Sequence, residues 1–553
     1  MERNLDRLQS EVFDVVVVGA GAHGACMAME AAQRGLSVAL IDKGDFSSAT
    51  SHNSLKIVHG GIRYLQHVDF GRVRQSIVER RFWLNSAPHM VVPLEFWVPL
   101  RGWGTRGAAA LWAGMRVHEL VGWDRNRGLL ADRTVSKGRI HGRKAVSQAL
   151  GKIWGEEPPP AAVWSDGQML DADRLILECI VAAEGSGAVI GNYVEAIGLQ
   201  QTRDGDVAGL EVRDTQNMHE FRIRAKNVVL AAGPWIAKLA DAMSGDRVVS
   251  KHARQIRNMN IVVPQKLAGR AIGIDSEQKS DAVVGKSNRL FFMTPWRNCS
   301  VIGTTHEPYD GDPNDYKVTE DEVSDFVSEV SEACPPLDLK LSEVQYVYAG
   351  LTPSDGEDGS PARSRSAEVV DHGSSGGTRG VYSIIGVKYT TARSLAERTV
   401  DLIGRESGNV QPSRTATSPL PGARGMASMR SLLEQIRAAG PMDEDEVSDL
   451  AIAYGTRFRQ VLKMVEGPLT PAAIFAARVR LAVREEMAQK IEDVALRRLD
   501  WMPRGFLDKE HGRVISQIMA SELGWTAEEE ERNFSAFSQE LRDGVLTPSW
   551  SSQ

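Results

Sequence analysis

Residues 13–42, FDVVVVGAGAHGACMAMEAAQRGLSVALID, carry the pattern that decides the fold. Residues 13–18 are almost all apolar and β-branched, which is typical of a strand buried on both faces of a parallel sheet. The Ala- and Met-rich residues 25–34 favour a helix, which Gly35 ends. Residues 36–41 predict a second strand. This order of strand, turn, helix and strand predicts the start of an α/β domain.

The turn after the first strand, GAGAHG, fits the G-x-G-x-x-G pattern of dinucleotide-binding domains. Gly19 permits the tight turn, Gly21 lets a pyrophosphate approach the backbone, and Gly24 lets the helix pack closely on the strand. The helix N-terminus offers N–H groups to that anion. Asp42, about 20 residues further on, is the expected acceptor for the ribose hydroxyls. A Gly-rich turn in another α/β protein is the alternative, but every context condition of the fingerprint is met.

The fingerprint alone fits either FAD or NAD, and two features favour FAD. The fingerprint lies at the start of a long chain. A second strand that runs into Gly-Pro follows at residues 227–235 (NVVLAAGPW), and it predicts a second wall for the longer cofactor. Gly233 and Trp235 are therefore expected to contact FAD.

The composition is that of an ordinary globular protein, with 42% apolar residues and 25% charged residues. The net charge of −7 argues against nucleic acid as a partner. The four cysteines form no C-x-x-C or Cys/His cluster, so we expect neither disulfides nor a metal site, and a reducing cytoplasm. We expect no secretory signal and no membrane span, because no apolar run of about 18 residues occurs.

The rest of the chain predicts further domains. Strand-like runs such as 209–212, 260–263 and 290–293 predict an antiparallel sheet beside the parallel one. The predicted fold class is mixed α/β (α+β), with a Rossmann-like FAD-binding domain, an antiparallel-sheet substrate domain and a C-terminal all-helical domain. The predicted divisions are 1–95 and 166–245 for the FAD-binding domain, 96–165 for an insertion with a candidate membrane-surface segment, 246–350 for the substrate domain, 351–404 for a return to the FAD-binding domain, 405–425 for a linker and 426–553 for the helical domain.

Residues 51–65, SHNSLKIVHGGIRYL, resemble FAD-dependent glycerol-3-phosphate dehydrogenases of the D-amino-acid-oxidase-like superfamily. That family has a Ser/Thr-rich loop followed by Lys-Leu-hydrophobic-His-Gly-Gly-hydrophobic-Arg-Tyr-Leu. Further motifs in the family's order occur along nearly the whole chain, including residues 171–175, 302–305, 388–391 and 484–498. The resemblance implies FAD, a helical C-terminal domain and oxidation of an alcohol. The chain is identified as a divergent member of this family.

The resemblance implies site residues whose chemistry is suitable. Arg63 and Lys388 are cations that would hold a phosphate or the negative charge of a reduced flavin. His59 or Tyr64 would help to remove a hydroxyl proton. Each also has an ordinary alternative, such as a surface ion pair or a turn histidine. The expected catalytic residues are Arg63, Tyr64, His59, Lys388 and Arg365, and the expected FAD contacts are Gly19, Gly21, Gly24, Asp42, Thr50, Ser51, Lys56, His59, Gly60, Gly61, Gly233, Trp235, Gly386, Lys388, Thr390 and Thr391.

The chain departs from the family where the substrate is expected. After Tyr-x-Gly the family continues with a substrate-binding arginine, but this chain has Thr352, which forfeits a charge-assisted bond of about 1.5–3 kcal/mol. Arg365, or Arg363 beside it, would compensate. These changes indicate a reshaped substrate pocket.

Three further departures lie around the same pocket. The family's Ser-His is Met-Asn here, so Asn260 replaces a candidate proton acceptor, and His306 follows Gly-Thr-Thr where the family often has Asp. The family's Gly-Gly-Lys is Gly-Val-Lys here, with Val387 as the bulkier residue. His52 replaces a small residue in the loop through which some superfamily members attach FAD. We expect non-covalent FAD, with a histidyl–flavin bond through His52 as the alternative.

Residues 100–144 are rich in Arg, Trp and Leu and contain few acids. A basic amphipathic segment of this kind would lie on an anionic membrane surface. The alternative is a partly buried helix with solvated arginines. The location expected is therefore the cytoplasm, with contact at the inner face of the membrane, and a homodimer is a further expectation.

The leading hypothesis is an FAD-dependent enzyme that moves a hydride from a secondary alcohol to flavin. Glycerol 3-phosphate or a related polyol phosphate is the first candidate substrate, and quinone or O2 the electron acceptor. An amine or amino-acid oxidase of the same superfamily is one alternative, against which the phosphate-type cations and the helical domain count. A flavin-binding protein without catalysis is another, against which the intact Arg63 and Lys388 count.

Overall fold

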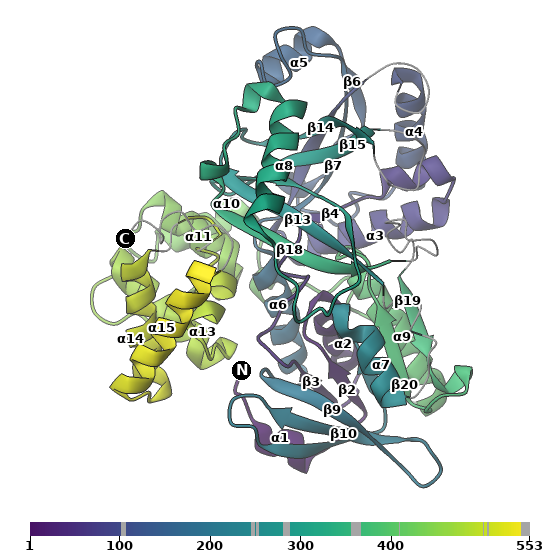
Figure 1. Cartoon of the computed structure of the whole chain (residues 1–553), viewed down its shortest axis with the longest axis vertical. Coiled ribbons are helices and arrows are strands. Elements are labelled where there is room, and N and C mark those ends of the chain that lie inside the picture. Colours follow the sequence, from purple (N-terminus) through teal and green to yellow (C-terminus); the bar gives the residue numbers. More distant parts are fainter. Residues whose placement is uncertain are drawn as a thin grey trace.

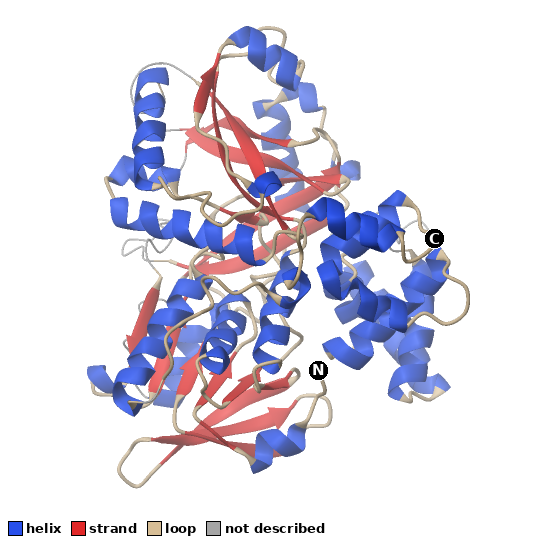
Figure 2. Cartoon of the chain, turned by 180° about the vertical axis from the view of Figure 1, so that it is seen from behind, coloured by secondary structure: helices blue, strands red, loops and turns tan. Residues whose placement is uncertain are grey.

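A computed structural model describes residues 1–100, 107–244, 249, 254–279, 288–354, 367–408, 410–501, 503–505 and 508–543. Two sheet-containing regions lie one above the other along the long axis, and a helical region lies beside them (Figures 1 and 2). The predicted fold class is confirmed: the chain is a mixed α/β protein with a C-terminal helical domain.

A six-stranded sheet organises the first region, in the order β19-β20-β12-β2-β3-β8. The five strands from β20 to β8 are parallel, and β19 runs antiparallel at one edge. The residues of β2 alternate between two cores, because Val15 and Val17 pack against helices while Val16 and Val18 pack against a second sheet. This explains why the strand is apolar at every position. The strands are β2 (Val15–Val18), β3 (Val38–Ile41), β8 (Val189–Gly191), β12 (Val228–Leu230), β19 (Glu368–Asp371) and β20 (Val381–Ile385).

Helices cover one face of this sheet and a small sheet covers the other. Helix α2 (Ala22–Gln33) packs between α6 (Ala172–Glu184) and α9 (Ala392–Ser407), and the three share the larger core. Helix α7 (Ile236–Ser244) lies with the small sheet on the opposite side. That sheet has the order β1-β11-β10-β9, with β1 (Val12–Phe13), β9 (Val194–Gln201), β10 (Val207–Asp214) and β11 (Glu220–Ala225).

The first predicted strand is interrupted at Asp14. Residues Val12–Phe13 pair with β11, whereas Val15–Val18 pair with β3 and β12. Asp14 accepts hydrogen bonds from the backbone N–H of Ser37 at 3.0 Å and from the ammonium group of Lys226 at 2.8 Å. The chain therefore passes from one sheet to another at a residue whose side chain is polar.

A ten-stranded sheet organises the second region, in the order β17-β13-β16-β15-β14-β5-β7-β4, with β18 paired to β13 and β6 to β7. Helix α8 (Glu320–Ala333) packs on the core of this sheet. The strands are β4 (Ile57–Val58), β5 (Val91–Pro99), β6 (Arg139–His141), β7 (Ala161–Met169), β13 (Gln255–Pro264), β14 (Arg270–Lys279), β15 (Asn288–Trp296), β16 (Cys299–Gly303), β17 (Glu307–Tyr309) and β18 (Tyr346–Pro353). Strands from residues 91–99 and 161–169 thus join the sheet of the expected substrate domain, although the predicted domain divisions remain predictions.

The helical region is held to the region of the parallel sheet by buried ion pairs. Arg174 pairs with Glu486 at 2.7 Å, and both side chains are fully buried. Asp45 forms ion pairs with Arg497 at 2.6 Å and with Arg498 at 2.8 Å. The helices are α10 (Met429–Arg437), α11 (Glu444–Tyr454), α12 (Phe458–Lys463), α13 (Pro471–Glu486), a π-helical turn (Asp493–Arg498), α14 (Lys509–Leu523) and α15 (Ala527–Asp543).

Several helical elements lie before β7. The 3-10 helix η1 (Ile62–His67) leads into α3 (Phe70–Ser86), and α4 (Ala108–Val121) and α5 (Arg143–Leu150) follow. Helix α4 stands at the edge of the molecule, on the side away from the helical region (Figure 1). Among the described residues, no helix is both long enough and apolar enough to cross a bilayer.

Candidate active site

A cavity of about 1170 Å³ lies between the parallel sheet and the ten-stranded sheet. Its lining includes the segments that follow β2, β3, β12 and β20, which are the carboxyl ends of the parallel strands. Ligands of open α/β sheets bind at that edge. The volume exceeds that of a typical pocket for one small ligand, which is about 300–1,000 Å³. The cavity therefore has room for an extended cofactor and a small substrate together.

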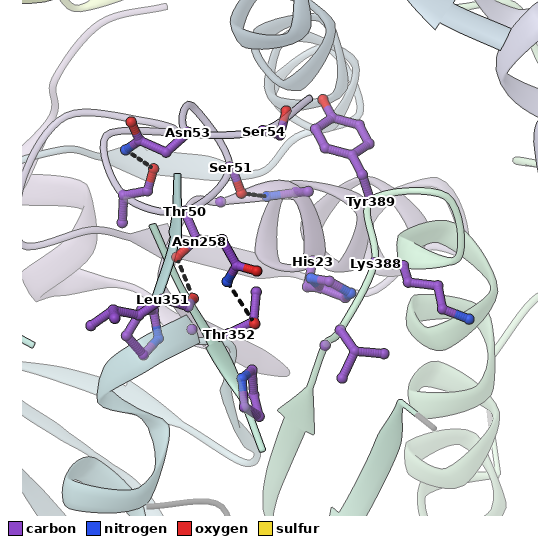
Figure 3. A pocket seen from close by; sticks show the side chains of 18 of the residues that line it. His23, Thr50, Ser51, Asn53, Ser54, Asn258, Leu351, Thr352, Lys388 and Tyr389 are labelled. Atoms are coloured by element: carbon purple, nitrogen blue, oxygen red, sulfur yellow. Dashed lines mark hydrogen bonds between the residues drawn. The ribbon is translucent and has the colours of Figure 1, made fainter. Parts of the chain in front are cut away.

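The glycine-rich turn has the geometry that its sequence predicts. Gly19 has a φ of +100°, and a Cβ atom there would lie 2.6 Å from the carbonyl oxygen of Ala231. A Cβ atom on Gly24 would lie 1.7 Å from the carbonyl oxygen of Gly19, so only glycine lets α2 approach the turn. Gly21 faces the cavity, where the hydroxyl of Ser51 accepts a hydrogen bond from the backbone N–H of Ala22 at 3.0 Å (Figure 3).

Asp42 directly follows β3 and lines the cavity. Its carboxylate accepts hydrogen bonds from the backbone N–H groups of Ala20 at 2.6 Å and Gly44 at 2.9 Å. Burial raises its pKa to about 6, and the two N–H donors oppose that rise. These bonds fix the carboxylate beside the glycine-rich turn, where a ribose is expected.

The surroundings of His23 and Gly386 show whether the cavity fits a dinucleotide. The His23 ring lies so close to Gly386 that a Cβ atom there would be 2.1 Å away. Its Nε2 atom is buried and has no hydrogen-bond partner among the described residues, and burial lowers its pKa to about 4. An orphaned polar nitrogen, glycines without room for a Cβ atom and a helix N-terminus all face one cavity, and these features fit FAD.

The expected cations meet on one part of the cavity wall. The Lys388 ammonium lies 4.0 Å from the ring centroid of Tyr64, and Arg63 precedes Tyr64 in η1. The His59 backbone N–H donates to the Thr390 hydroxyl at 3.1 Å, which ties the two loops together. Burial lowers the pKa of His59 to about 4, and the positive charges of Lys388 and Arg63 contribute.

Most of the expected site residues line the cavity. Exceptions are Gly24 and Gly60, which pack behind it, and Thr391, which begins α9 without a side-chain capping bond. Arg365 and Arg363 lie outside the described residues. The lining includes Gly19, Gly21, Asp42, Thr50, Ser51, Lys56, His59, Gly61, Arg63, Tyr64, Gly233, Trp235, Gly386, Lys388 and Thr390.

Lys56 and His52 have side chains that are buried away from solvent. The Lys56 ammonium lies 4.3 Å from the ring centroid of Tyr348 and 4.9 Å from that of Trp296. The His52 ring is absent from the cavity lining. Its nitrogens lie 2.9 Å from the Asp173 carboxylate and 3.3 Å from the Tyr346 hydroxyl. This arrangement favours non-covalent FAD over a bond through His52.

Sequence reasoning missed an aromatic wall of the cavity. Phe96 stacks on Trp164 with ring centroids 6.1 Å apart, and it meets Phe292 edge to face at 5.4 Å. The three residues come from β5, β7 and β15, so no local motif contains them. Their only sequence signal is alternation within separate strands.

The residues that depart from the family form an uncharged part of the wall. Asn258 donates to the Thr352 hydroxyl at 3.0 Å (Figure 3). The Thr304 hydroxyl donates to Asn260 at 2.6 Å. Val387 also lines the cavity. The structure thus gives the substituted positions Thr352 and Asn260 neutral hydrogen-bond partners.

A Rossmann-type turn and a cation cluster that share one large cavity define a dinucleotide-dependent oxidoreductase. The sequence profile of the family described as "FAD dependent oxidoreductase" matches residues 14–407, and that of the "C-terminal domain of alpha-glycerophosphate oxidase" matches residues 413–530. The chain belongs to the FAD-dependent oxidoreductase family, and its relatives there are named glycerol-3-phosphate dehydrogenases. The predicted family and cofactor are both confirmed.

Several relatives match over nearly their whole length. Glycerol-3-phosphate dehydrogenase of Synechocystis sp. is 29% identical, over 98% of this chain and 99% of the relative. The Pseudomonas aeruginosa enzyme of the same name is 30% identical, over 88% of this chain and 92% of the relative. The structure of glycerol-3-phosphate dehydrogenase from Bacillus halodurans, complexed with FAD, superposes with a TM-score of 0.76 at 25% identity and covers 98% of this chain and 97% of that one.

Proposed function

We propose that this protein oxidises the secondary alcohol of glycerol 3-phosphate or a closely related polyol phosphate and passes the electrons to quinone or O2. The observation that carries the proposal is the meeting of Arg63, Tyr64 and Lys388 on the wall of a cavity that fits FAD. The names of the relatives support the same substrate class. Bound FAD supplies the hydride acceptor.

The residues of the chain have separable tasks in this reaction. Arg63 and Lys388 bind the anionic end of the substrate, because guanidinium and ammonium groups make charge-assisted hydrogen bonds to phosphate. The aromatic wall of Phe96, Trp164 and Phe292 limits the access of water to the reacting carbon. Thr352 contributes no charge, so phosphate is held by fewer cations than in the family pattern.

The test is anaerobic reduction of the purified holoenzyme by candidate donors, followed by the loss of flavin absorbance. Glycerol 3-phosphate and polyol phosphates should bleach the flavin, whereas unphosphorylated polyols, hydroxy acids and amines should not. The variant R63M should raise the half-saturating donor concentration about 10- to 150-fold, the equivalent of one charged hydrogen bond. The matched control is R72M, because Arg72 also lines the cavity but pairs with Asp69 at 3.0 Å. Reduction by amines alone would establish the amine-oxidase alternative, and no reduction by any donor would establish the non-catalytic one.

We further propose a peripheral contact between the α4 region and an anionic membrane at the cytoplasmic face. Trp112, Leu120 and Trp123 are 54%, 75% and 74% exposed, and Val68 and Phe70 are also exposed. Arg116 and Arg125 lie among them and complement anionic lipid. Quinone as acceptor and a homodimer remain predictions.

Vesicle sedimentation tests the membrane contact. Wild-type protein should sediment with phosphatidylglycerol vesicles and should be released by salt, because the attraction is partly electrostatic. The double variant W112S/W123S should lose most of this binding. The control M218S removes an apolar side chain that is 61% exposed on the distant β10–β11 turn, and it should bind as wild type does. Equal binding by both variants would refute the contact.

A further inference from the structure

Strand β13 presents two asparagines to the cavity. Alternate residues of a strand face the same side, so Asn258 and Asn260 line the cavity while Met259 and Ile261 pack into the core beneath α8. His306 follows β16, the neighbouring strand, in which Gly303 is paired with Asn260. His306 also lines the cavity, and its imidazole lies beside Asn258.

The Asn258 amide has a fixed orientation. Its Nδ2 atom donates to the carbonyl of Ile256 at 2.9 Å and to the Thr352 hydroxyl at 3.0 Å, and it lies 3.4 Å from the carbonyl of Gly350. Carbonyl oxygens only accept, so these contacts assign the donating nitrogen of the amide. The Oδ1 atom of Asn258 is therefore the acceptor that faces His306.

This amide selects one tautomer of His306. The Nδ1 atom of His306 lies 2.8 Å from Oδ1 of Asn258, and an oxygen acceptor requires a hydrogen on that nitrogen. A neutral imidazole with a proton on Nδ1 carries its lone pair on Nε2. By holding Nδ1 in this way, the Asn258 amide orients Nε2 of His306 to act as a base.

We propose that His306 is the catalytic base that accepts the hydroxyl proton of the substrate, and that Asn258 is its positioning residue. The inference rests on the proposed function and deepens it. The O–H bond of the alcohol breaks and its proton moves to Nε2 of His306. The C–H hydrogen leaves with its electron pair as hydride to the oxidised flavin, the carbon–oxygen double bond forms, and the substrate is oxidised as the flavin is reduced.

The other candidates on the cavity wall are poorer bases. His59 is neutral but weakly basic, because burial lowers its pKa to about 4. Asn260 is an amide, and its Oδ1 already accepts from Thr304. Tyr64 lies against the Lys388 ammonium, which the proposed function assigns to the anionic end of the substrate. His306 lies beside Asn258, two residues before Asn260, where the family carries its histidine, and it would supply a base from the segment between β16 and β17.

The charges around His306 are paired with one another. Arg257 of β13 pairs with Glu322 of α8. Arg289 of β15 pairs with Glu307 of β17 at 3.1 Å and with Glu329 of α8 at 3.0 Å. The cations Arg63 and Lys388 line the same cavity.

Anaerobic stopped-flow reduction of the FAD-loaded enzyme tests the proposal. H306A should lower the limiting rate of flavin reduction at least 100-fold, the usual contribution of a general base, and added imidazole should restore part of it. N258D should shift the acidic limb of the pH–rate profile to higher pH by about one unit, because a carboxylate beside Nδ1 favours the protonated ring. The FAD dissociation constant, measured by flavin fluorescence, should not change in either variant. H219A, at an exposed histidine near the β10–β11 turn, is the control and should behave as wild type.

The outcomes separate this inference from the proposed function. Reduction of H306A at the wild-type rate would overturn the role of His306 and leave the proposed function intact. An unmoved pH profile in N258D would overturn the role of Asn258. If the flavin of the wild-type enzyme stays oxidised with every donor, both the proposed function and the role of His306 are overturned. If H306A fails to retain FAD, H306Q is measured by the same criteria, because it keeps a side chain of similar length.

Discussion

The ion pair between Asp45 and Arg498 should control how firmly the protein retains its flavin. Arg498 grips both carboxylate oxygens of Asp45 at 2.8 and 2.9 Å and donates to the carbonyl of Glu486 at 2.9 Å. The two side chains are 2% and 0% exposed. Asp45 lies three residues after Asp42, in the loop that forms the cofactor wall. The perturbation is R498M, which keeps the volume of the aliphatic stem and removes the charge.

The magnitude follows from burial. Breaking a buried ion pair by removing one partner costs about 3–5 kcal/mol, because the other charge is left uncompensated. Arg497 still contacts Asp45 at 2.6 Å, so the lower end of about 3 kcal/mol applies. For a cooperative unit of 150–250 residues this corresponds to a fall of roughly 6–12 °C in melting temperature.

The assay is a thermal scan that follows flavin fluorescence, which rises when the cofactor is released. The matched control is R437M, because Arg437 pairs with Glu444 at 2.7 Å on the surface, where the side chains are 44% and 73% exposed. That pair should contribute far less, because solvent screens exposed charges. Equal release temperatures for R498M and R437M would refute the reasoning, as would a lower melting temperature for R498M without earlier flavin release.

Three further predictions concern the cofactor. G24A should weaken FAD binding at least 100-fold, because its Cβ atom would lie 1.7 Å from a carbonyl oxygen. The control G142A should bind FAD normally, because a Cβ atom there would have no neighbour within 4 Å. Equilibrium titration with FAD measures both affinities. FAD affinity should fall as the pH drops through about 6, because burial raises the pKa of Asp42 to that value and only an ionised carboxylate would accept hydrogen bonds from both ribose hydroxyls. D42N should bind weakly with a flat profile over this range, and a parallel fall in D42N would contradict the assignment. Acid precipitation should release all of the flavin into the supernatant, and yellow colour retained in the pellet would instead point to a bond through His52.

The cofactor half of the cavity was predictable from the sequence because its requirements are local. Gly19, Gly24 and Asp42 lie within one strand–turn–helix–strand unit. The two glycines leave no room for a Cβ atom, backbone N–H groups hold the Asp42 carboxylate beside the turn, and its contact with ribose stays a prediction. The division of the first strand at Asp14 was not predictable, since both halves have the same apolar character and only pairing with β11 separates them.

The substrate half depends on register between distant strands. Asn258, Thr352 and His306 meet because β13 pairs with β18 and lies beside β16, and no periodicity within one segment sets that alignment. Lys56 shows the same limit for a single residue. The motif predicts a cofactor contact, which stays a prediction because Lys56 lines the cavity, but only the tertiary fold places two aromatic rings against its ammonium.

The ion pairs between Asp45 and the helical region also affect the order of events during synthesis of the chain. Asp45 leaves the ribosome 452 residues before Arg497. At typical synthesis rates of 5–20 residues per second, that interval is roughly 20–90 s. Throughout it, the loop that borders the cofactor lacks the guanidinium groups that neutralise its buried carboxylate. We therefore expect stable cofactor binding only after the helices that carry Arg497 and Arg498 have docked, long after the glycine-rich turn has been synthesised.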